Sequence, residues 1–298
     1  MARVAYVNGQ YVPYGQAAVH VEDRGFQFAD GVYEVIAILN GRLVDAEGHL
    51  VRLERSLDEL RIRHPMSRAA LTVVLNETVR RNRVKQGNIY LQITRGAARR
   101  EFAFPGDIPP TVVAIARSVD MTKAAANAAR GVAAITRPDI RWGRCDIKSV
   151  GLLPAALAKQ AAKEAGAYEA WLVDRDGYVT EGSSSNAWIV TKDNVLVTRA
   201  LSTAILGGIT RSAMLELARR EGLTVENRAF TVAEALAAKE AFVTSTTSYA
   251  MPVVSLDGQP IGNGGPGVVA SRLRALYEAH AVSHGAGDAD WEAGFLAP

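Results

Sequence analysis

The sequence predicts an α+β fold in two domains. Strand and helix patterns alternate irregularly instead of in regular βαβ units, and the 298 residues, 48% of them apolar, exceed one typical domain. An alanine-rich, weakly patterned segment, residues 119–131, separates two halves of similar character. We therefore expect a smaller domain over residues 1–118 and a larger domain over residues 132–298, joined by that linker.

The first half begins with two predicted hairpins. "VAYVNGQYV" and "VYEVIAILNGRLVDA" each carry an Asn-Gly pair between β-branched or alternating runs, which is the strongest short hairpin signal. From His49 the period changes, and leucines at positions 50, 53, 57 and 60 share one helix face. A second helix is expected over residues 67–84, after which "IYLQIT" and "TVVAIA" return to strand.

The second half mixes the same elements. A helix is expected between Pro154, which suits a first turn, and Gly166, which suits the position just past a helix end. Two hairpins follow around "DRDG" and "TKDN". Another helix is expected from Thr210 to Gly222, and "AFVTSTTS" is typical of a buried strand that runs into a polar turn.

Composition excludes several classes of function. The excess of basic groups is only three charges, and many arginines have glutamates nearby, which does not favour a nucleic-acid surface. The single cysteine, Cys145, excludes an internal disulfide, and without a CxxC pair no metal site is predicted. With no spanning apolar stretch and no signal-peptide core, we expect a cytoplasmic protein.

One of only seven lysines in a chain with twenty-seven arginines stands in the short strand-like run around Ile147 and Val150. Lys148 is the type of side chain that captures a carbonyl as an imine, because a desolvated amine can lose its proton whereas arginine stays charged. A buried lysine without a function is costly. The sequence leaves an ion pair, for example with Asp146, as the alternative.

Two segments could bind an anion. In "LGGITRS" two glycines precede a helix, where free backbone amides and the helix dipole attract negative charge. An ordinary capped helix after a glycine turn is the alternative interpretation. The "STTS" turn, residues 245–248, offers similar groups, although such turns often serve only their own backbone.

Glu181, in "VTEGSSSN", stands before a glycine and three serines. It could belong to a solvated loop. If it faced a heteroaromatic nitrogen, its charge would hold that nitrogen protonated and make the ring an electron sink. An imine-forming lysine, a phosphate cup and such a carboxylate together describe a pyridoxal phosphate site.

Six motifs in order carry a family resemblance. The chain from about Val4 to Leu276 resembles pyridoxal phosphate enzymes of fold type IV, and most of all D-amino-acid transaminases. Relatives of these enzymes are branched-chain aminotransferases, (R)-selective amine transaminases and aminodeoxychorismate lyases. The motifs are "EDRGFQFADGVYE", "HLVRLERS", "RWGRCDIKS", "VTEGSSSN", "GGITR" and "VTSTTS". The resemblance implies a small N-terminal α/β domain and a larger C-terminal domain with a β-barrel-like core.

The resemblance also implies roles for individual residues. Lys148 would be the Schiff-base residue and proton carrier, and Glu181 would be the partner of the pyridine nitrogen. Leu206 would pack on the cofactor ring, and Tyr33 would help to hold the substrate carboxylate. The cofactor phosphate would be bound by Arg52, Ile209, Thr210 and Thr246, and the cofactor hydroxyl or Glu181 would be supported by Ser184, Ser185 and Asn186. Enzymes of this fold type are usually homodimers with the site near the interface.

The loop "TRGAARREFAFP" departs from the family pattern. D-amino-acid transaminases commonly place an arginine and, two residues later, a histidine here, and both reach from the partner chain to the substrate carboxylate. Arg100 fits the arginine, but Phe102 stands at the histidine position and cannot donate a hydrogen bond; Arg99 is a possible substitute. In "STTSYAMP", Tyr249 stands where relatives often carry glutamate, and Thr247 is a further substrate-binding candidate. We therefore expect weaker binding of the substrate carboxylate and some acceptance of (R)-amines.

The expected activity is transfer of an amino group from a D-amino acid, such as D-alanine or D-glutamate, to 2-oxoglutarate or pyruvate. In such a cycle the first substrate leaves as a keto acid and its amino group stays on the cofactor until a second keto acid takes it up, which gives ping-pong kinetics. A branched-chain L-amino acid aminotransferase and an aminodeoxychorismate lyase remain the alternatives on the same fold.

Overall fold

The computed structural model describes residues 3–284, which form two compact units. The first contains the described residues up to Met121, the segment Ile147–Gly151 and the end of α8 from Ala281. The second contains Thr122–Asp146 and Leu152–His280. The segment expected to be a linker contains a helix, α4 (Met121–Arg130), which follows from the high helix propensity of its alanines. The domain limits 1–118 and 132–298 stay a prediction.

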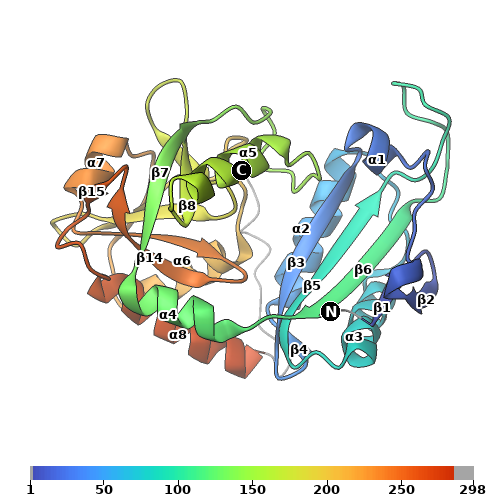
Figure 1. Cartoon of the computed structure of the whole chain (residues 1–298), viewed down its shortest axis with the longest axis horizontal. Coiled ribbons are helices and arrows are strands. Elements are labelled where there is room, and N and C mark those ends of the chain that lie inside the picture. Colours follow the sequence, from blue (N-terminus) through green and yellow to red (C-terminus); the bar gives the residue numbers. More distant parts are fainter. Residues whose placement is uncertain (1–2, 285–298) are drawn as a thin grey trace. The chain divides into compact units, whose positions relative to one another are not determined.

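The first unit is built on a six-stranded antiparallel sheet in the order β2-β1-β6-β5-β3-β4 (Figure 1). Both Asn-Gly hairpins are confirmed: Asn8 and Gly9 have φ of 46° and 92°, and Asn40 and Gly41 have φ of 53° and 79°. Positive φ at both central residues is the requirement of a type I′ turn. The strands are β1 (Val4–Val7), β2 (Gln10–Pro13), β3 (Gly31–Leu39), β4 (Arg42–Leu43), β5 (Gln86–Thr94) and β6 (Thr111–Ser118).

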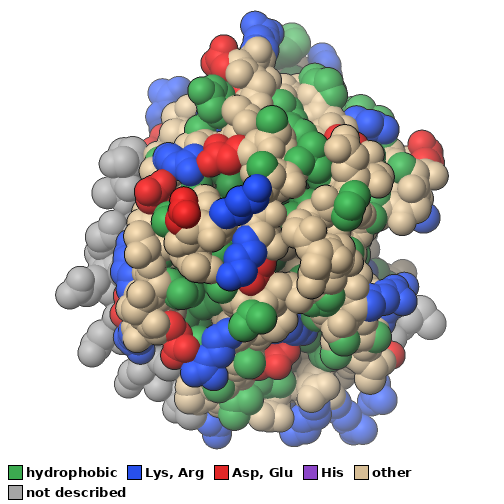
Figure 2. All heavy atoms as spheres, turned by 90° about the vertical axis from the view of Figure 1, so that its left-hand side faces the viewer, with side chains coloured by type: hydrophobic (Ala, Val, Ile, Leu, Met, Phe, Trp, Pro, Cys, Tyr) green, Lys and Arg blue, Asp and Glu red, His purple; other side chains and the backbone are tan. Residues whose placement is uncertain are grey.

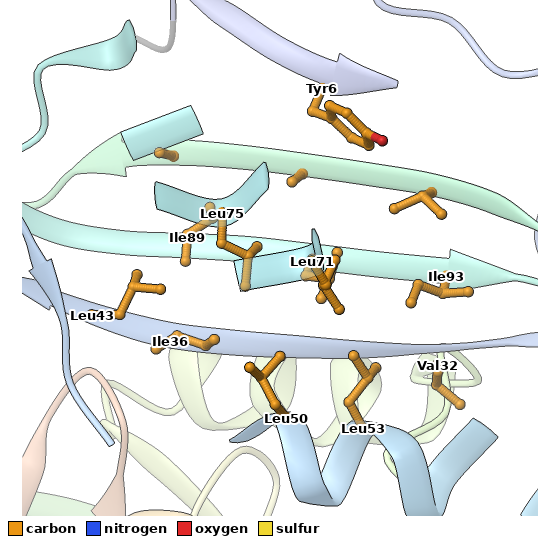
Figure 3. Packing of buried hydrophobic residues seen from close by; sticks show 14 of the residues in the cluster. Tyr6, Val32, Ile36, Leu43, Leu50, Leu53, Leu71, Leu75, Ile89 and Ile93 are labelled. Carbon is orange, nitrogen blue, oxygen red and sulfur yellow. The ribbon is translucent and has the colours of Figure 1, made fainter. Parts of the chain in front are cut away.

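Two helices cover the core of this sheet. They are α2 (Ala46–Glu59) and α3 (Arg68–Asn82), and both confirm the predicted helices; Leu60 lies just beyond the end of α2. Figure 3 shows their leucines packed with isoleucines from the central strands, and all of these side chains are buried. Smaller helices, η1 (Tyr14–Gln16) and α1 (Arg24–Phe28), lie between β2 and β3 in the chain.

A buried ionic cluster joins α2 to β3. Glu34 alternates with Val32 and Ile36 along β3, so it points to the core side, where it is 0% exposed. Its carboxylate accepts hydrogen bonds from Arg52 Nε and Nη2, each at 2.7 Å, and lies 2.7 Å from His49 Nδ1. Burial by itself would raise the pKa of Glu34, but Arg52 and His49 outweigh it and hold the pKa at about 2.

The second unit contains a curled nine-stranded sheet. Its path is β12-β11-β10-β13-β14-β7-β8-β9, with β15 paired to β14, and β9 also contacts β10, which gives the expected barrel-like core. The strands are β7 (Val132–Pro138), β8 (Glu169–Val173), β9 (Val179–Gly182), β10 (Asn186–Val190), β11 (Leu196–Thr198), β12 (Val225–Asn227), β13 (Glu240–Ser245), β14 (Tyr249–Leu256) and β15 (Gln259–Pro260).

Helices surround this sheet (Figure 1). Besides α4 they are α5 (Leu153–Glu164), α6 (Ile209–Arg220), α7 (Val232–Ala237) and α8 (Val268–His284). The core beneath them contains two aromatic pairs, Trp171 with Phe230 at 5.9 Å and Trp188 with Phe242 at 5.4 Å between ring centroids. The α+β class is confirmed, since helices and strands are both abundant and sheets of mainly antiparallel pairing organise both units.

The visible surface carries charges of both signs. On the face in Figure 2, Lys and Arg side chains lie beside Asp and Glu side chains without a large region of one sign. Among the helices of residues 3–284, none combines the length and the apolar character that crossing a lipid bilayer requires.

Leu75→Ala should destabilise the first unit, because Leu75 on α3 is 0% exposed and its loss leaves a cavity between helix and sheet. We expect the free energy of unfolding to fall by about 3 kcal/mol in urea denaturation. Val73→Ala on the same helix is the control: Val73 is 67% exposed, so its change should stay within about 0.5 kcal/mol. Equal losses in both variants would contradict this packing.

Glu34→Gln should cost about 3 kcal/mol at neutral pH, because it leaves the buried Arg52 guanidinium without its carboxylate. The folded pKa of Glu34 lies below its unfolded value, so its contribution is complete above about pH 4.5 and is lost as pH falls toward 2. Urea midpoints measured between these pH values should therefore fall less steeply in the variant than in the wild type. If the urea midpoints of the variant and the wild type fell equally with pH, ionisation of Glu34 would not contribute to the pH dependence of stability.

Candidate active site

Lys148 lies in a short segment that extends one edge of the first sheet. Residues 147–151 pair with the start of β3: the Tyr33 amide donates to the Lys148 carbonyl and the Val150 amide donates to the Gly31 carbonyl, both at 3.0 Å. β4 pairs only with the far end of β3, so this part of the edge is available to the segment.

The pleat then decides where the lysine side chain goes, because successive side chains point to opposite faces. Ile147 is 4% exposed and joins the core beneath the helices. Lys148 therefore projects to the other face, where its Nζ lies 4.2 Å from the ring centroid of Tyr33. No carboxylate among the described residues of the first unit forms an ion pair with it. Asp146, the alternative partner suggested by the sequence, pairs with Arg144 at 2.9 Å instead.

Arg52, the expected phosphate ligand, is 3% exposed and is bound to Glu34 through two of its nitrogens. Its role toward a phosphate stays a prediction. Tyr33 lies on the same face as Lys148, and its ring is 5.7 Å from that of Tyr90.

Glu181 is a buried carboxylate at the end of β9, 5% exposed, and three donors converge on it. Arg141 Nη1 donates to Oε1, the Asn186 side-chain amide donates to Oε2 at 2.9 Å, and the Leu206 backbone amide donates at 3.1 Å. The solvated-loop alternative for Glu181 is therefore wrong. Since all three neighbours donate, the arrangement favours the ionised carboxylate.

Burial raises the pKa of Glu181 above its ordinary value, although the Arg141 guanidinium and the Leu206 amide act in the opposite direction. Arg141 is itself held by Asp139, through bonds of 2.9 and 2.7 Å, and it also donates to the Ala204 carbonyl at 3.1 Å. Several hydrogen bonds thus hold the Glu181 carboxylate and the Arg141 guanidinium in one arrangement.

The three serines after Glu181 share one acceptor. Ser183, Ser184 and Ser185 all donate their hydroxyls to Glu169, a carboxylate on β8 that is 1% exposed. Sequence reasoning missed Glu169, because it lies within a strand pattern with no motif of its own. The hydroxyls of Ser184 and Ser185 are thus bound to Glu169, while the Asn186 side chain donates to Glu181.

The start of α6 has the features of an anion site. Gly208 is the N-cap, and no side chain caps the helix. A Cβ at Gly208 would collide with Asn186 Oδ1, so only glycine fits. The amides of Ile209 and Thr210 begin the helix, and both residues are 3% exposed.

A buried cation lies in the first turn of the same helix. The Arg211 side chain donates to the Arg199 carbonyl at 2.8 Å and to Asn227 at 3.0 Å, and its Nε has no hydrogen-bond partner among the described residues. Burial lowers the pKa of Arg211 to about 10. This positive charge adds to the attraction of the helix start for an anion.

The polar turn after β13 uses its serines internally. Ser245 Oγ and Ser248 Oγ are 2.6 Å apart, and the Ser248 amide donates to Ser245 at 3.3 Å. Thr246 and Thr247 lie between them at the tip of the turn, and Tyr249 follows with φ of 57°. The serines therefore build the turn, which leaves the two threonines as the candidates for ligand contacts.

The loop after β5 presents the remaining candidates. Phe102 is 77% exposed, and Arg99 and Arg100 are exposed beside it. The Arg100 guanidinium carbon lies 5.2 Å from the Phe28 ring centroid and 5.8 Å from that of Phe102. Arg100 is thus stacked on aromatic rings, and it forms no ion pair among the described residues of the first unit.

These groups fit pyridoxal phosphate. A lysine without an ion pair among the described residues of its unit suits the aldehyde, the buried carboxylate of Glu181 suits the ring nitrogen, and the glycine start of α6, uncapped by any side chain and followed by Arg211, suits the phosphate. Each of these groups is matched to the cofactor by its own chemistry and by its contacts within its own unit.

The comparisons with known proteins identify the same cofactor class. Residues 31–256 match the family model described as amino-transferase class IV. The D-alanine aminotransferase of Bacillus licheniformis is 45% identical over 271 residues, which are 91% of this chain and 94% of that protein. The D-alanine aminotransferase of Listeria innocua is 38% identical over 91% of this chain and 93% of its own.

The fold comparison gives the same class. The T.th. branched-chain amino acid aminotransferase, solved with pyridoxamine 5'-phosphate, superimposes with a TM-score of 0.87 at 30% identity and covers 95% of each chain. The resemblance to fold type IV is confirmed. The chain is therefore an aminotransferase that belongs to the class IV aminotransferase family and uses pyridoxal 5'-phosphate.

Proposed function

We propose that this enzyme transfers the amino group of a D-amino acid, of the D-alanine or D-glutamate type, to 2-oxoglutarate or pyruvate. The observation that carries this proposal is the 45% identity to a D-alanine aminotransferase over nine-tenths of the chain. The proposal includes a homodimer with the site near the interface, a cytoplasmic location that suits the single cysteine, and side activity on (R)-amines.

In the proposed reaction Lys148 acts twice. When bound, pyridoxal phosphate supplies an aldehyde that takes up the amino group and a ring that accepts electrons. Lys148 Nζ would hold the aldehyde carbon in the resting enzyme and move the α-proton once an amino acid has replaced it. Its position supports this role, because the pleat directs Nζ away from the core and toward the Tyr33 ring, with no carboxylate among the described residues of its unit to occupy it.

Glu181 would keep a proton on the ring nitrogen. The three hydrogen bonds that it accepts hold its oxygens in place and favour the charged form that this role needs. The phosphate would be bound by the amides of Ile209 and Thr210, by Thr246 and by Arg52. Leu206 would pack on the ring, and Ser184, Ser185 and Asn186 would support the cofactor or Glu181.

The substrate carboxylate would be held by Tyr33 and Arg100, with Arg99 and Thr247 as further contacts. Arg100 supports this role because its charge is exposed and is not neutralised by an ion pair among the described residues of its unit. Phe102 cannot donate a hydrogen bond, so we propose a weaker carboxylate trap than that of a site with histidine at this position.

A branched-chain L-amino acid aminotransferase is the second candidate. The 30% identity to the T.th. enzyme over 95% of both chains favours it, because the fold is shared and the handedness depends on details of the pocket. The higher identity to the D-alanine enzymes supports D-specificity.

The test is a survey of half-reactions with the cofactor-loaded enzyme. We expect its visible absorption band to disappear with D-alanine and D-glutamate and to persist with their L-enantiomers and with L-leucine. Lys148→Ala should show no turnover, because the carrier of both proton transfers is missing. Lys163→Ala, an exposed lysine on α5, is the matched control and should react like the wild type.

Reaction with L-leucine alone would assign the chain to the branched-chain activity instead. Near-normal rates in Lys148→Ala would remove that lysine from the mechanism.

Phe102→His should lower the Michaelis constant for D-alanine by roughly tenfold, the effect of one added charge-assisted hydrogen bond of about 1.5 kcal/mol. Steady-state kinetics with a fixed excess of 2-oxoglutarate measure it. Phe26→His is the matched control, because Phe26 is also 77% exposed. An unchanged Michaelis constant in Phe102→His would count against the carboxylate role of position 102.

A further inference from the structure

The first family motif, "EDRGFQFADGVYE", contains more than Tyr33, and the roles described so far leave its first half unexplained. This half forms α1, whose N-cap Asp23 accepts the Gly25 amide at 2.9 Å, and it ends at Ala29, where φ is 56°. Arg24 in this half and Asp30 directly after it form an ion pair, and their side chains are only 3% and 9% exposed. Buried charges of this kind need a structural or functional reason.

The loop after β5 lacks repetitive structure. From residue 98 to residue 110 it contains neither helix nor strand, and most of its residues are exposed. Such a loop is normally mobile unless specific contacts hold it. It carries Arg99, Arg100 and Phe102, so its order determines where these three side chains lie.

Arg24 supplies the contacts that hold the middle of this loop. Its Nε donates to Asp30 at 2.8 Å, which directs the other nitrogens outward, and Nη1 donates to the Glu101 carbonyl at 2.6 Å. The Arg24 amide donates to the Gly96 carbonyl at 2.9 Å, and the Ala98 amide donates to the Glu22 carbonyl at 3.2 Å. Side chain and backbone of the motif thus hold the loop at successive points.

Asp30 is shared with a second arginine that holds the far part of the loop. Arg95 donates to Asp30 at 2.7 and 3.0 Å and to the carbonyls of Leu60 and Arg61 at 2.7 and 2.8 Å. Its guanidinium carbon lies 3.6 Å from the centroid of the Phe104 ring. One buried carboxylate therefore fixes both guanidinium groups that anchor the loop.

The same helix also orients the two side chains of interest. The Phe28 ring lies 5.5 Å from the Phe102 ring, and the Arg100 guanidinium carbon lies 5.2 and 5.8 Å from their two centroids. Arg24 also packs on this group, 4.6 Å from the Phe28 centroid. The stack holds the Arg100 guanidinium by cation–π contacts and leaves its hydrogen-bond donors for an anion.

We propose that Arg24 is a positioning residue for substrate binding: by holding the Glu101 carbonyl, it fixes Arg100 and Phe102 and so sets the affinity for the substrate carboxylate. This inference rests on the proposed function. It also gives the family motif a physical role, because the motif provides both the anchor and its carboxylate.

Arg24→Gln tests it, with two measurements on the cofactor-loaded enzyme. Hydrogen–deuterium exchange of peptides from residues 97–106 should become at least about tenfold faster, because the loop loses its central contact. The Michaelis constant for D-alanine should rise roughly tenfold, the scale of one charge-assisted contact, while kcat stays within about twofold. Cofactor affinity and the visible spectrum should not change.

Arg63→Gln is the matched control, because Arg63 also binds this loop, through Asp107 at 2.9 Å, but that pair is exposed and lies away from Arg100 in sequence. It should leave exchange, Michaelis constant and kcat at wild-type values. Arg24→Lys keeps a cation for Asp30 but cannot bridge to the Glu101 carbonyl as well. It should also raise the Michaelis constant with little change in kcat, but by a smaller factor than Arg24→Gln.

Each outcome is decisive. If hydrogen–deuterium exchange were unchanged in Arg24→Gln, Arg24 would not be what holds the loop. If exchange became faster but the Michaelis constant stayed the same, Arg24 would have no positioning role in substrate binding. Loss of fold in both Arg24 variants, seen by circular dichroism, would also contradict a role confined to the loop. If the wild type proved inactive with D-amino acids, the proposed function would fail while the exchange data still reported on the anchor.

Discussion

The short pairing between residues 147–151 and the free edge of β3 is the constraint on which the site depends. Two backbone hydrogen bonds set the register, and the alternation of the pleat then buries Ile147 and directs Lys148 to the opposite face. A slip by one residue would exchange these side chains and place an ammonium group in the core. The apolar residue before the lysine is therefore part of the reason that the lysine is in position.

Several buried carboxylates among the described residues are paired with arginine. Glu34, Asp30 and Glu181 each face one or two arginines, and Glu169 accepts three serine hydroxyls. Arginine suits these positions because its planar fork satisfies two acceptors at once and it stays charged in any environment. Lys148, the lysine of the proposed chemistry, forms no such pair among the described residues of its unit.

Much of the fold could be predicted because its signals are local. Asn-Gly pairs specify type I′ turns, leucine spacing specifies α2, and Pro154 and Gly166 bracket α5. The helix α4 was not predicted, because its alanine-rich sequence was interpreted as a weakly patterned linker. For the site, motif resemblance nominated Lys148, Glu181 and the start of α6, whose roles remain predictions. Arg24, Arg141 and Glu169 could not be assigned, because their partners are distant in sequence and only the fold brings them together.

The shared carboxylate of Asp30 has a consequence for the order in which the chain folds. Asp30 directly precedes β3 and Arg95 directly follows β5, and the register of that pair places Gly31 opposite Thr94. Until these two strands pair, Arg95 is separated from Asp30, and of the two arginines only Arg24, six residues away in sequence, can reach that carboxylate. The loop between β5 and β6 can therefore gain its full set of contacts only after β3 and β5 have paired, so an ordered loop reports that this pairing has formed.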